Sequence, residues 1–123
     1  MNLISWNIRG LNGHSKQTLL RECIIAEQPD IMFLQETKCA MEEMDRVISR
    51  CWKQGKIIFT DATGTAGGLA ILWNPCSVLM ENFFTARWSV LAKCRLISSN
   101  NPSLLTNVYL LASPRDKTNS FVI

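Results

Sequence analysis

A strand, a helix and a second strand follow one another at the start of the chain. Residues 2–8 alternate apolar and polar side chains, which is typical of a strand with one buried face. Residues 16–27 carry apolar side chains at helical spacing, and the sequence predicts that Ser15 caps this helix and that Pro29 ends it. Residues 30–34 form a short apolar run, as in a strand buried on both faces. We therefore expect a βαβ unit.

Polar side chains stand at the ends of both predicted strands. A helical crossover makes the two strands parallel, so Asn7 and the pair Gln35 and Glu36 should lie at the same edge of the sheet. One carboxylate with amide neighbours suits Mg²⁺, a hard cation that prefers oxygen ligands. The alternative interpretation is that Glu36 only marks the end of a strand at the protein surface.

The remainder of the chain is rich in β-forming residues after one further helix. Apolar residues recur every three or four positions over residues 40–52, which indicates an amphipathic helix. A βαβ start followed by antiparallel strands predicts a mixed sheet with helices on its outer face and room for a second layer that these residues do not supply. Such a sheet exposes apolar surface and could self-associate. The expected strands are residues 56–60, 68–73, 77–84, 88–97 and 104–110.

The charges permit a polyanionic partner without requiring one. The formal net charge is +3, which is too small to indicate nucleic-acid binding by itself. Arg87, Lys93 and Arg95 share one face of a predicted strand over residues 87–97, where they could follow a nucleic-acid backbone or form an ordinary solvated face. Tyr109, the only tyrosine, ends the last predicted strand and could donate to a phosphate or pack in the core.

Cysteine and histidine usage argues against a zinc site and against secretion. Five cysteines occur without any C-x-x-C pair, and His14 is the only histidine, placed by the sequence on a loop before the first helix. Reduced thiols that act as small hydrophobic residues are the simpler interpretation. No apolar run is long enough for a membrane span, and the first residues do not resemble a signal peptide. The sequence thus predicts an intracellular protein, nuclear or cytoplasmic, that does not bind a membrane.

Several short blocks of sequence follow one another at characteristic spacing. The blocks are residues 5–11 (SWNIRGL), 29–31 (PDI), 33–38 (FLQETK), 67–73 (GGLAILW) and 107–109 (NVY). In this order they resemble the endonuclease/exonuclease/phosphatase family, and in particular the endonuclease domain of plant LINE-type (non-LTR) retrotransposons. The resemblance extends to about Tyr109, and its strongest element is the Leu-Gln-Glu-Thr-Lys block.

This resemblance implies a DNase I-like fold, a four-layer α/β sandwich of two β-sheets flanked by helices. It also implies Mg²⁺-dependent hydrolysis of phosphodiester bonds in DNA by an activated water. Carried over to this sequence, Asn7 would orient the site and contact phosphate, Glu36 would ligate the metal with Asn7 beside it, and Tyr109 would contact the scissile phosphate.

Other parts of the family pattern have no counterpart in the 123 residues. The Gly-Asp-x-Asn block is missing, as is the C-terminal Asp-His pair, and His14 lies at the opposite end of the chain. We therefore expect residues 1–123 to be a truncated, N-terminal half of such a domain and to be inactive, because hydrolysis needs groups that align and deprotonate water. The alternative is a residual DNA-binding or protein-interaction module that uses the exposed sheet.

Overall fold

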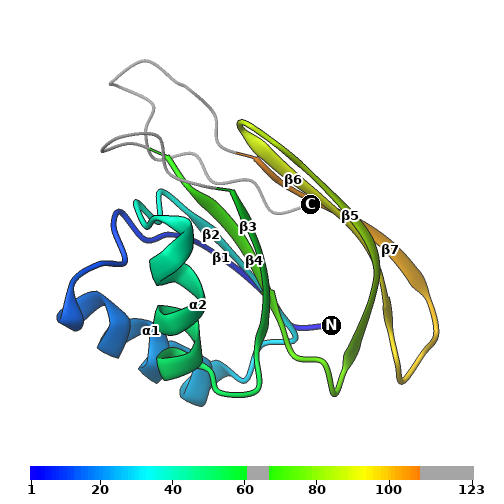
Figure 1. Cartoon of the computed structure of the whole chain (residues 1–123). Helices are drawn as coiled ribbons and strands as arrows, with labels where there is room; N and C mark the ends of the chain where they lie inside the picture. The colour runs from blue at the N-terminus through cyan, green and yellow to red at the C-terminus, as the bar shows by residue number, and fades with distance from the viewer. Residues whose placement is uncertain (61–66, 109–123) are drawn as a thin grey trace.

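Two helices and seven strands make up the described part of the protein. The computed structural model describes residues 1–60 and 67–108. Figure 1 shows the helices on one side, a sheet in the middle and a second sheet beyond it. The elements are β1 (Leu3–Asn7), α1 (His14–Glu27), β2 (Ile31–Gln35), α2 (Met41–Cys51), β3 (Lys56–Thr60), β4 (Leu69–Trp73), β5 (Val78–Ala86), β6 (Ser89–Leu96) and β7 (Pro102–Val108).

The first sheet has the strand order β1-β2-β4-β3. β1 and β2 run parallel and are joined through α1, so the predicted βαβ unit is confirmed. β4 lies antiparallel between β2 and β3, which makes β3 an edge strand. Both helices cover the same face of this sheet (Figure 1).

The second sheet is an antiparallel meander in the order β5-β6-β7. The expectation that the residues supply no second layer was therefore wrong. A turn after β4 redirects the chain, and Asn74 O accepts hydrogen bonds from the backbone N–H groups of Ser77 and Val78 (3.1 and 2.9 Å). The apolar face of β6 then packs onto the first sheet instead of extending it, because Val90 and Ala92 bury their side chains completely in that arrangement.

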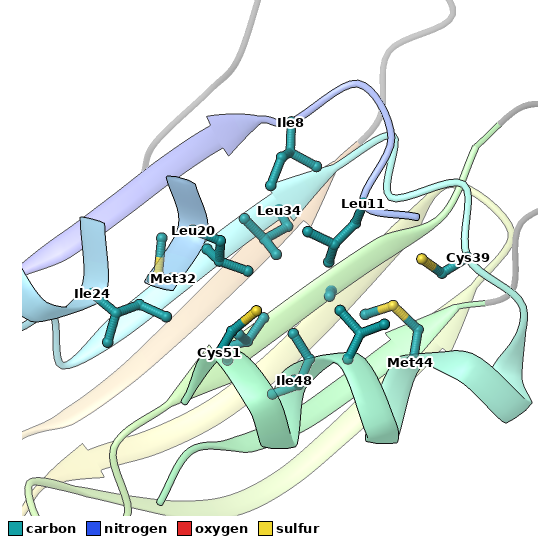
Figure 2. Packing of buried hydrophobic residues seen from close by; sticks show 13 residues of the cluster. Ile8, Leu11, Leu20, Ile24, Met32, Leu34, Cys39, Met44, Ile48 and Cys51 are labelled. Carbon is teal, nitrogen blue, oxygen red and sulfur yellow. The ribbon is translucent and has the colours of Figure 1, made fainter. Parts of the chain in front are cut away.

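β2 contributes to both hydrophobic cores. Met32 and Leu34 point toward the helices, where they meet Leu20 of α1 and Ile48 of α2 (Figure 2). Ile31 and Phe33 belong to the cluster between the two sheets, together with residues of β4, β6 and β7. This burial on both faces explains the continuous apolar run in the sequence.

The helix boundaries differ slightly from those predicted. α1 begins at His14, with Gly13 in the N-cap position and no side-chain cap, so Ser15 lies inside the helix and the predicted Ser15 cap was wrong. The extended backbone of Gly13 (φ −81°, ψ 144°) already satisfies the N-cap geometry, and its carbonyl accepts from Gln17 N (3.2 Å). Gln28, with φ +46°, ends the helix. The prediction for α2 is confirmed to within one residue at each end.

The described residues therefore form three layers, the helices, the first sheet and the second sheet, as expected of a mixed α/β fold with two sheets. The outer face of the second sheet carries the exposed side chains of Leu79, Phe84 and Leu104. Neither helix in the described residues has the length and apolar character to cross a membrane.

Candidate functional site

The candidate site lies where β1 and β2 end. Asn7 and Gln35 are directly paired in the parallel register, and Ile8 N donates to Gln35 O (3.1 Å). Glu36 follows at once, and its carbonyl accepts from Gly10 N (2.7 Å). The prediction that Asn7 and Glu36 are neighbours at one sheet edge is thus confirmed by the register of the two strands.

The backbone at this edge is held in an unfavourable conformation. Arg9, Glu36 and Lys38 all have left-handed φ values between 52° and 54°, a region that L-residues with a Cβ rarely adopt. Neighbouring loops hold the conformation, because Leu11 N donates to Thr37 O (2.9 Å) and Lys38 N donates to Gly67 O (3.1 Å). Residues kept in such regions cluster at functional sites. The backbone around Glu36 is therefore held by hydrogen bonds from the loop after β1 and to the residues before β4.

A buried network of amide side chains joins the site to the second sheet. Gln35 Nε2 donates to Ser5 Oγ (3.0 Å) and to Asn107 Oδ1 (2.8 Å). Asn107 is completely buried, and its Nδ2 donates to the backbone carbonyls of Leu34 (3.1 Å) and Ala70 (2.9 Å). Asn107 thus fixes the orientation of Gln35 from the opposite sheet.

Sequence reasoning did not identify Asn107 as a site residue. A signal was present, because Asn107 follows the buried Leu105 by two positions and so occupies the inward face of β7. A polar side chain at an inward position must find a partner.

Three buried oxygen atoms at this edge have no hydrogen-bond partner within the described protein: Asn7 Oδ1, Gln35 Oε1 and Thr37 Oγ1. Nearly all buried polar atoms in native proteins are paired, so an orphaned group indicates a ligand, an ion or a water. Two of the three are amide oxygens, and they belong to Asn7 and Gln35, which are paired in the register directly before Glu36. Oxygen donors of this kind fit a hard divalent cation.

Carboxylates and imidazoles do not gather elsewhere in the described residues. No group of three or more His, Cys, Asp or Glu side chains that could hold a metal occurs in residues 1–60 and 67–108. A cation such as Mg²⁺ needs only one or two protein carboxylates when a phosphate ligand completes its shell. The residues present fit that limited role.

Of the three predicted cations, the structure brings Arg87 to the site edge and leaves two outside it. Arg87 lies in the turn between β5 and β6, not in a strand, and its guanidinium stands 4.9 Å from the centre of the Trp88 ring. The Trp88 ring approaches Gly67, whose carbonyl accepts from Lys38 N next to Thr37. Arg87 is therefore connected to the Glu36 loop through these contacts.

Lys93 and Arg95 lie farther along β6, on the outer face of the second sheet. Arg95 Nε donates to Glu81 Oε1 (2.6 Å) in an ion pair, and Arg95 Nη1 donates to Asn100 O (3.1 Å). Lys93 is exposed and lies opposite Leu104 in the register. The expectation that the three cations share one strand face holds only for these two.

His14, predicted on a loop, is instead the exposed first residue of α1, because the helix begins directly after the extended Gly13, and it lines a hollow between the two helices. Tyr109 lies outside the described residues.

Comparison with known proteins supports the same family as the sequence blocks. A sequence profile of the endonuclease/exonuclease/phosphatase family matches residues 4–91. The chain is 40% identical over 50 residues to recombination repair protein 1 of Drosophila melanogaster, a match that covers 41% of this chain and 7% of that protein.

Solved structures share the fold at low sequence identity. The human Nocturnin catalytic domain with bound sulfate matches with a TM-score of 0.74 at 17% identity, over 93% of this chain and 51% of that one. The 3′ phosphatase NExo from Neisseria, bound to a product DNA hairpin, matches with a TM-score of 0.69 at 20% identity, over 95% of this chain and 46% of that one.

The chain thus spans about half the length of these solved chains, and the expected DNase I-like fold is confirmed. The family profile covers well over half of the 123 residues, from the first strand of the βαβ unit into β6. The protein belongs to the endonuclease/exonuclease/phosphatase family.

Proposed function

We propose that this chain supplies the metal- and phosphate-binding edge of a Mg²⁺-dependent phosphodiester hydrolase that acts on DNA. The observation that carries the proposal is the set of buried, unpartnered amide oxygens of Asn7 and Gln35 beside Glu36 at the ends of two parallel strands. Ligands of α/β proteins bind at this end of the strands.

Each residue has a distinct part in the proposal. Glu36 and Asn7 hold the cation through their side-chain oxygens, and the left-handed backbone of Glu36 presents its carboxylate to the site. When bound, the cation neutralises charge that develops on phosphoryl oxygens. Gln35, oriented by Asn107, keeps the neighbouring polar surface rigid. Tyr109 contacts the scissile phosphate, and Arg87 contacts the DNA backbone near the same edge.

The DNA substrate is supported by the relatives and by the sequence blocks. The Neisseria structure holds a DNA hairpin, and the Drosophila relative is named for recombination repair. The finer resemblance to the endonuclease domain of plant LINE-type retrotransposons favours an endonuclease. On this basis the parent activity is the cutting of an internal phosphodiester bond.

We further propose that the 123 residues have no nuclease activity alone. The only histidine, His14, lies on α1 and lines the hollow between the helices. Alignment and deprotonation of the attacking water are worth about 10²- to 10⁴-fold in rate, and residues 1–60 and 67–108 contain no group of three or more His, Cys, Asp or Glu side chains around Glu36.

A plasmid-nicking assay with and without Mg²⁺ tests this proposal, with Glu36→Gln as the site variant and Glu22→Gln, an exposed residue of α1, as the matched control. We expect no nicking above that of Glu36→Gln. Mg²⁺-dependent nicking that Glu36→Gln abolishes and Glu22→Gln retains would show that the chain is an enzyme and overturn its proposed inactivity.

Metal binding is measured separately, because a chain without nuclease activity can still bind Mg²⁺ at the proposed site. In a Mg²⁺ titration followed by NMR, we expect the amide signals of Asn7 and Glu36 to shift in the wild type and in Glu22→Gln. The shifts should be lost in Glu36→Gln. Unchanged signals in the wild type would contradict the metal site itself.

The alternative function is an interaction module. The exposed apolar side chains of Leu79, Phe84 and Leu104 favour it, because large apolar residues on one sheet face indicate a surface that another chain can cover. Self-association through this face would appear in sizing experiments as a concentration-dependent dimer that Phe84→Ser weakens. A monomer at all concentrations would contradict it.

We also assign the protein to an intracellular compartment, nuclear or cytoplasmic. All five cysteines are free thiols in the structure, and Cys39, Cys51 and Cys94 are buried. Buried reduced thiols suit a reducing environment. Fractionation of cells that express a tagged chain, with the medium assayed in parallel, tests this assignment.

A further inference from the structure

Three adjoining hollows lie at the surface between α1 and α2, each with a volume of about 450 Å³. Neighbouring hollows share lining residues: Gln17 and Arg50 belong to the first two, and Arg21, Arg50 and Cys51 to the first and the last. They therefore form one continuous depression along the helix pair, which we call the interhelical groove. Figure 1 shows these helices on the outer side of the first sheet.

The charged residues that line the groove are mainly cations. Arg21 on α1, Arg46 and Arg50 on α2, and Lys53 just after α2 all contribute, against a single carboxylate, Glu43. A concave surface with one sign of charge concentrates the field of that charge. An anionic ligand is the complement of such a groove.

The guanidinium N–H donors in the groove have no hydrogen-bond partner among the described residues. Among the described residues Arg95 and Glu81 make the one ion pair, and Arg21, Arg46 and Arg50 form no hydrogen bond or ion pair with another described residue. Each guanidinium carries five N–H donors in a planar fork that matches a carboxylate. Surface arginines without an internal partner can give these donors to a ligand at no cost to the fold.

Two of these arginines face the same part of the groove from different helices. Burial raises the pKa of the Cys51 thiol, and the charges of Arg21 and Arg50 both oppose that rise. Arg21, Arg50 and Cys51 also line the same two of the three hollows, so both guanidinium groups and the thiol belong to one part of the groove. A carboxylate above Cys51 can be approached from two sides.

One end of the groove adds apolar surface. Ile24, Ile25 and Trp52 line that hollow, and Ile25 is 63% exposed. Such an exposed branched side chain beside cations suits a ligand that carries both apolar and acidic groups. Peptides meet this requirement with alternating Leu and Glu or Asp side chains.

The flanks of the groove disfavour a nucleic-acid strand. Glu22 follows Arg21 on α1, and Glu42 and Asp45 stand on α2, all of them exposed. A polyanion that continues beyond the groove would bring its phosphates close to these carboxylates. A short peptide with a few acidic residues can place its charges within the groove alone.

We propose that the interhelical groove binds a short acidic segment of a protein partner, with its carboxylates on Arg21 and Arg50 and its apolar side chains against Ile25 and Trp52. This binding does not depend on the hydrolase function, because the groove lies on the helical layer and uses none of the strand-end residues. Peptide binding in the groove would connect this chain to another protein and leave the candidate site at the strand ends accessible.

The test uses fluorescence anisotropy with a fluorescein-labelled peptide of alternating Glu and Leu, about as long as α2, and the full 123-residue chain. We expect saturable binding that Arg50→Gln weakens about ten-fold, equal to about 1.4 kcal/mol. Lys56→Gln, which removes the same charge from an exposed residue of β3, should leave the affinity unchanged. A Lys-Leu peptide with the same label should not bind.

The proposal would be overturned by the absence of saturable binding of the Glu-Leu peptide, by equal losses of affinity in Arg50→Gln and Lys56→Gln, or by equal binding of the Lys-Leu peptide. Tighter binding of a labelled oligothymidine that depends on Arg50 would assign the groove to nucleic acid and reject the peptide. Circular dichroism of both variants checks that each retains the fold of the wild type. Arg21→Gln provides a second groove variant should Arg50→Gln fail to fold.

Discussion

Gln35 Nε2 of the first sheet donates a hydrogen bond of 2.8 Å to Asn107 Oδ1 of the second. Both side chains are buried, at 3% and 0% exposure. The polar edge that carries Glu36 is therefore built by both sheets, and its geometry depends on how the sheets pack.

Replacing Asn107 by alanine should destabilise the protein by about 2 kcal/mol, because the change leaves buried polar partners without a donor or an acceptor. The groups affected are Gln35 Nε2 and the carbonyls of Leu34 and Ala70. Urea unfolding followed by circular dichroism measures the effect. Asn101→Ala, at an exposed position, is the control and should change stability by less than about 0.5 kcal/mol. Equal stability of the two variants would contradict the bridging role.

Replacing Gly68 by alanine should lower the free energy of unfolding by about 2 kcal/mol or more. Gly68 has φ +93°, and a Cβ at this position would overlap the side-chain hydroxyl of Thr37. Thr37 cannot easily move away, because its backbone N–H donates to Gly68 O. Gly13→Ser is the matched control, since Gly13 has open space around it and an extended N-cap backbone. That variant should be neutral or slightly stabilising, because serine is a good N-cap residue. A tolerated Gly68→Ala would mean that the Glu36 loop is less tightly packed than described.

Removing the charge of Arg87 should weaken DNA binding and reduce its dependence on salt. When a protein neutralises one phosphate fewer, the slope of log affinity against log salt becomes shallower by about 0.9. We expect this change in Arg87→Gln, because Arg87 stands at the site edge beside Trp88. Arg95→Gln should have little effect on the slope, since Arg95 is paired with Glu81 on the outer sheet face. The anisotropy of a labelled duplex, measured over a series of salt concentrations, gives the slope for both variants. A shallower slope in Arg95→Gln and an unchanged slope in Arg87→Gln would place the DNA on the outer face of the second sheet.

Stability should decline at alkaline pH because buried thiols resist ionisation in the folded protein. Burial, followed by the charge of Glu81, raises the pKa of Cys94 above its unfolded value. The folded state then binds more protons than the unfolded state once pH passes about 8.5, so the free energy of unfolding falls as pH rises from there toward the raised folded pKa. Below about 8.5 the contribution is complete.

The contribution of Cys94 is isolated by comparison with a variant. In Cys94→Ala, urea unfolding at about pH 7 and about pH 10 should show a smaller loss of stability between the two conditions than in the wild type. Cys76→Ala, at an exposed cysteine, should keep the wild-type dependence. An unchanged pH dependence in Cys94→Ala would show that other groups cause the decline.

The local pattern of the sequence was sufficient for the βαβ unit and for the placement of the first site residues. Alternation in residues 2–8 and the apolar run before Gln35 identify a half-buried and a fully buried strand, and the helical crossover between them makes them parallel. Asn7 and Glu36 could be placed together from these facts alone.

Pairing between distant strands could not be predicted in the same way. The alternation of β6 is the same whether it extends the first sheet or packs onto it, so the split into two sheets depends on the turn after β4 and on the fit of Val90 and Ala92 against the first sheet. The insertion of β4 between β2 and β3 likewise depends on pairing between strands that are distant in the sequence. Arg87 could be assigned to the site edge only once the position of the β5–β6 turn was known.

The hydrogen bond between Gln35 and Asn107 spans 72 positions of the chain. Forming an interaction between residues so far apart in the sequence closes a large loop, and loop closure costs conformational entropy. This cost is offset only after most of the intervening strands have paired, so the interaction forms late in folding. The helical layer and the first sheet bury their shared core through nearer contacts. We therefore expect the site to be among the last regions to assemble during folding, so that its charged and polar groups come together only in a chain that has already reached its native topology.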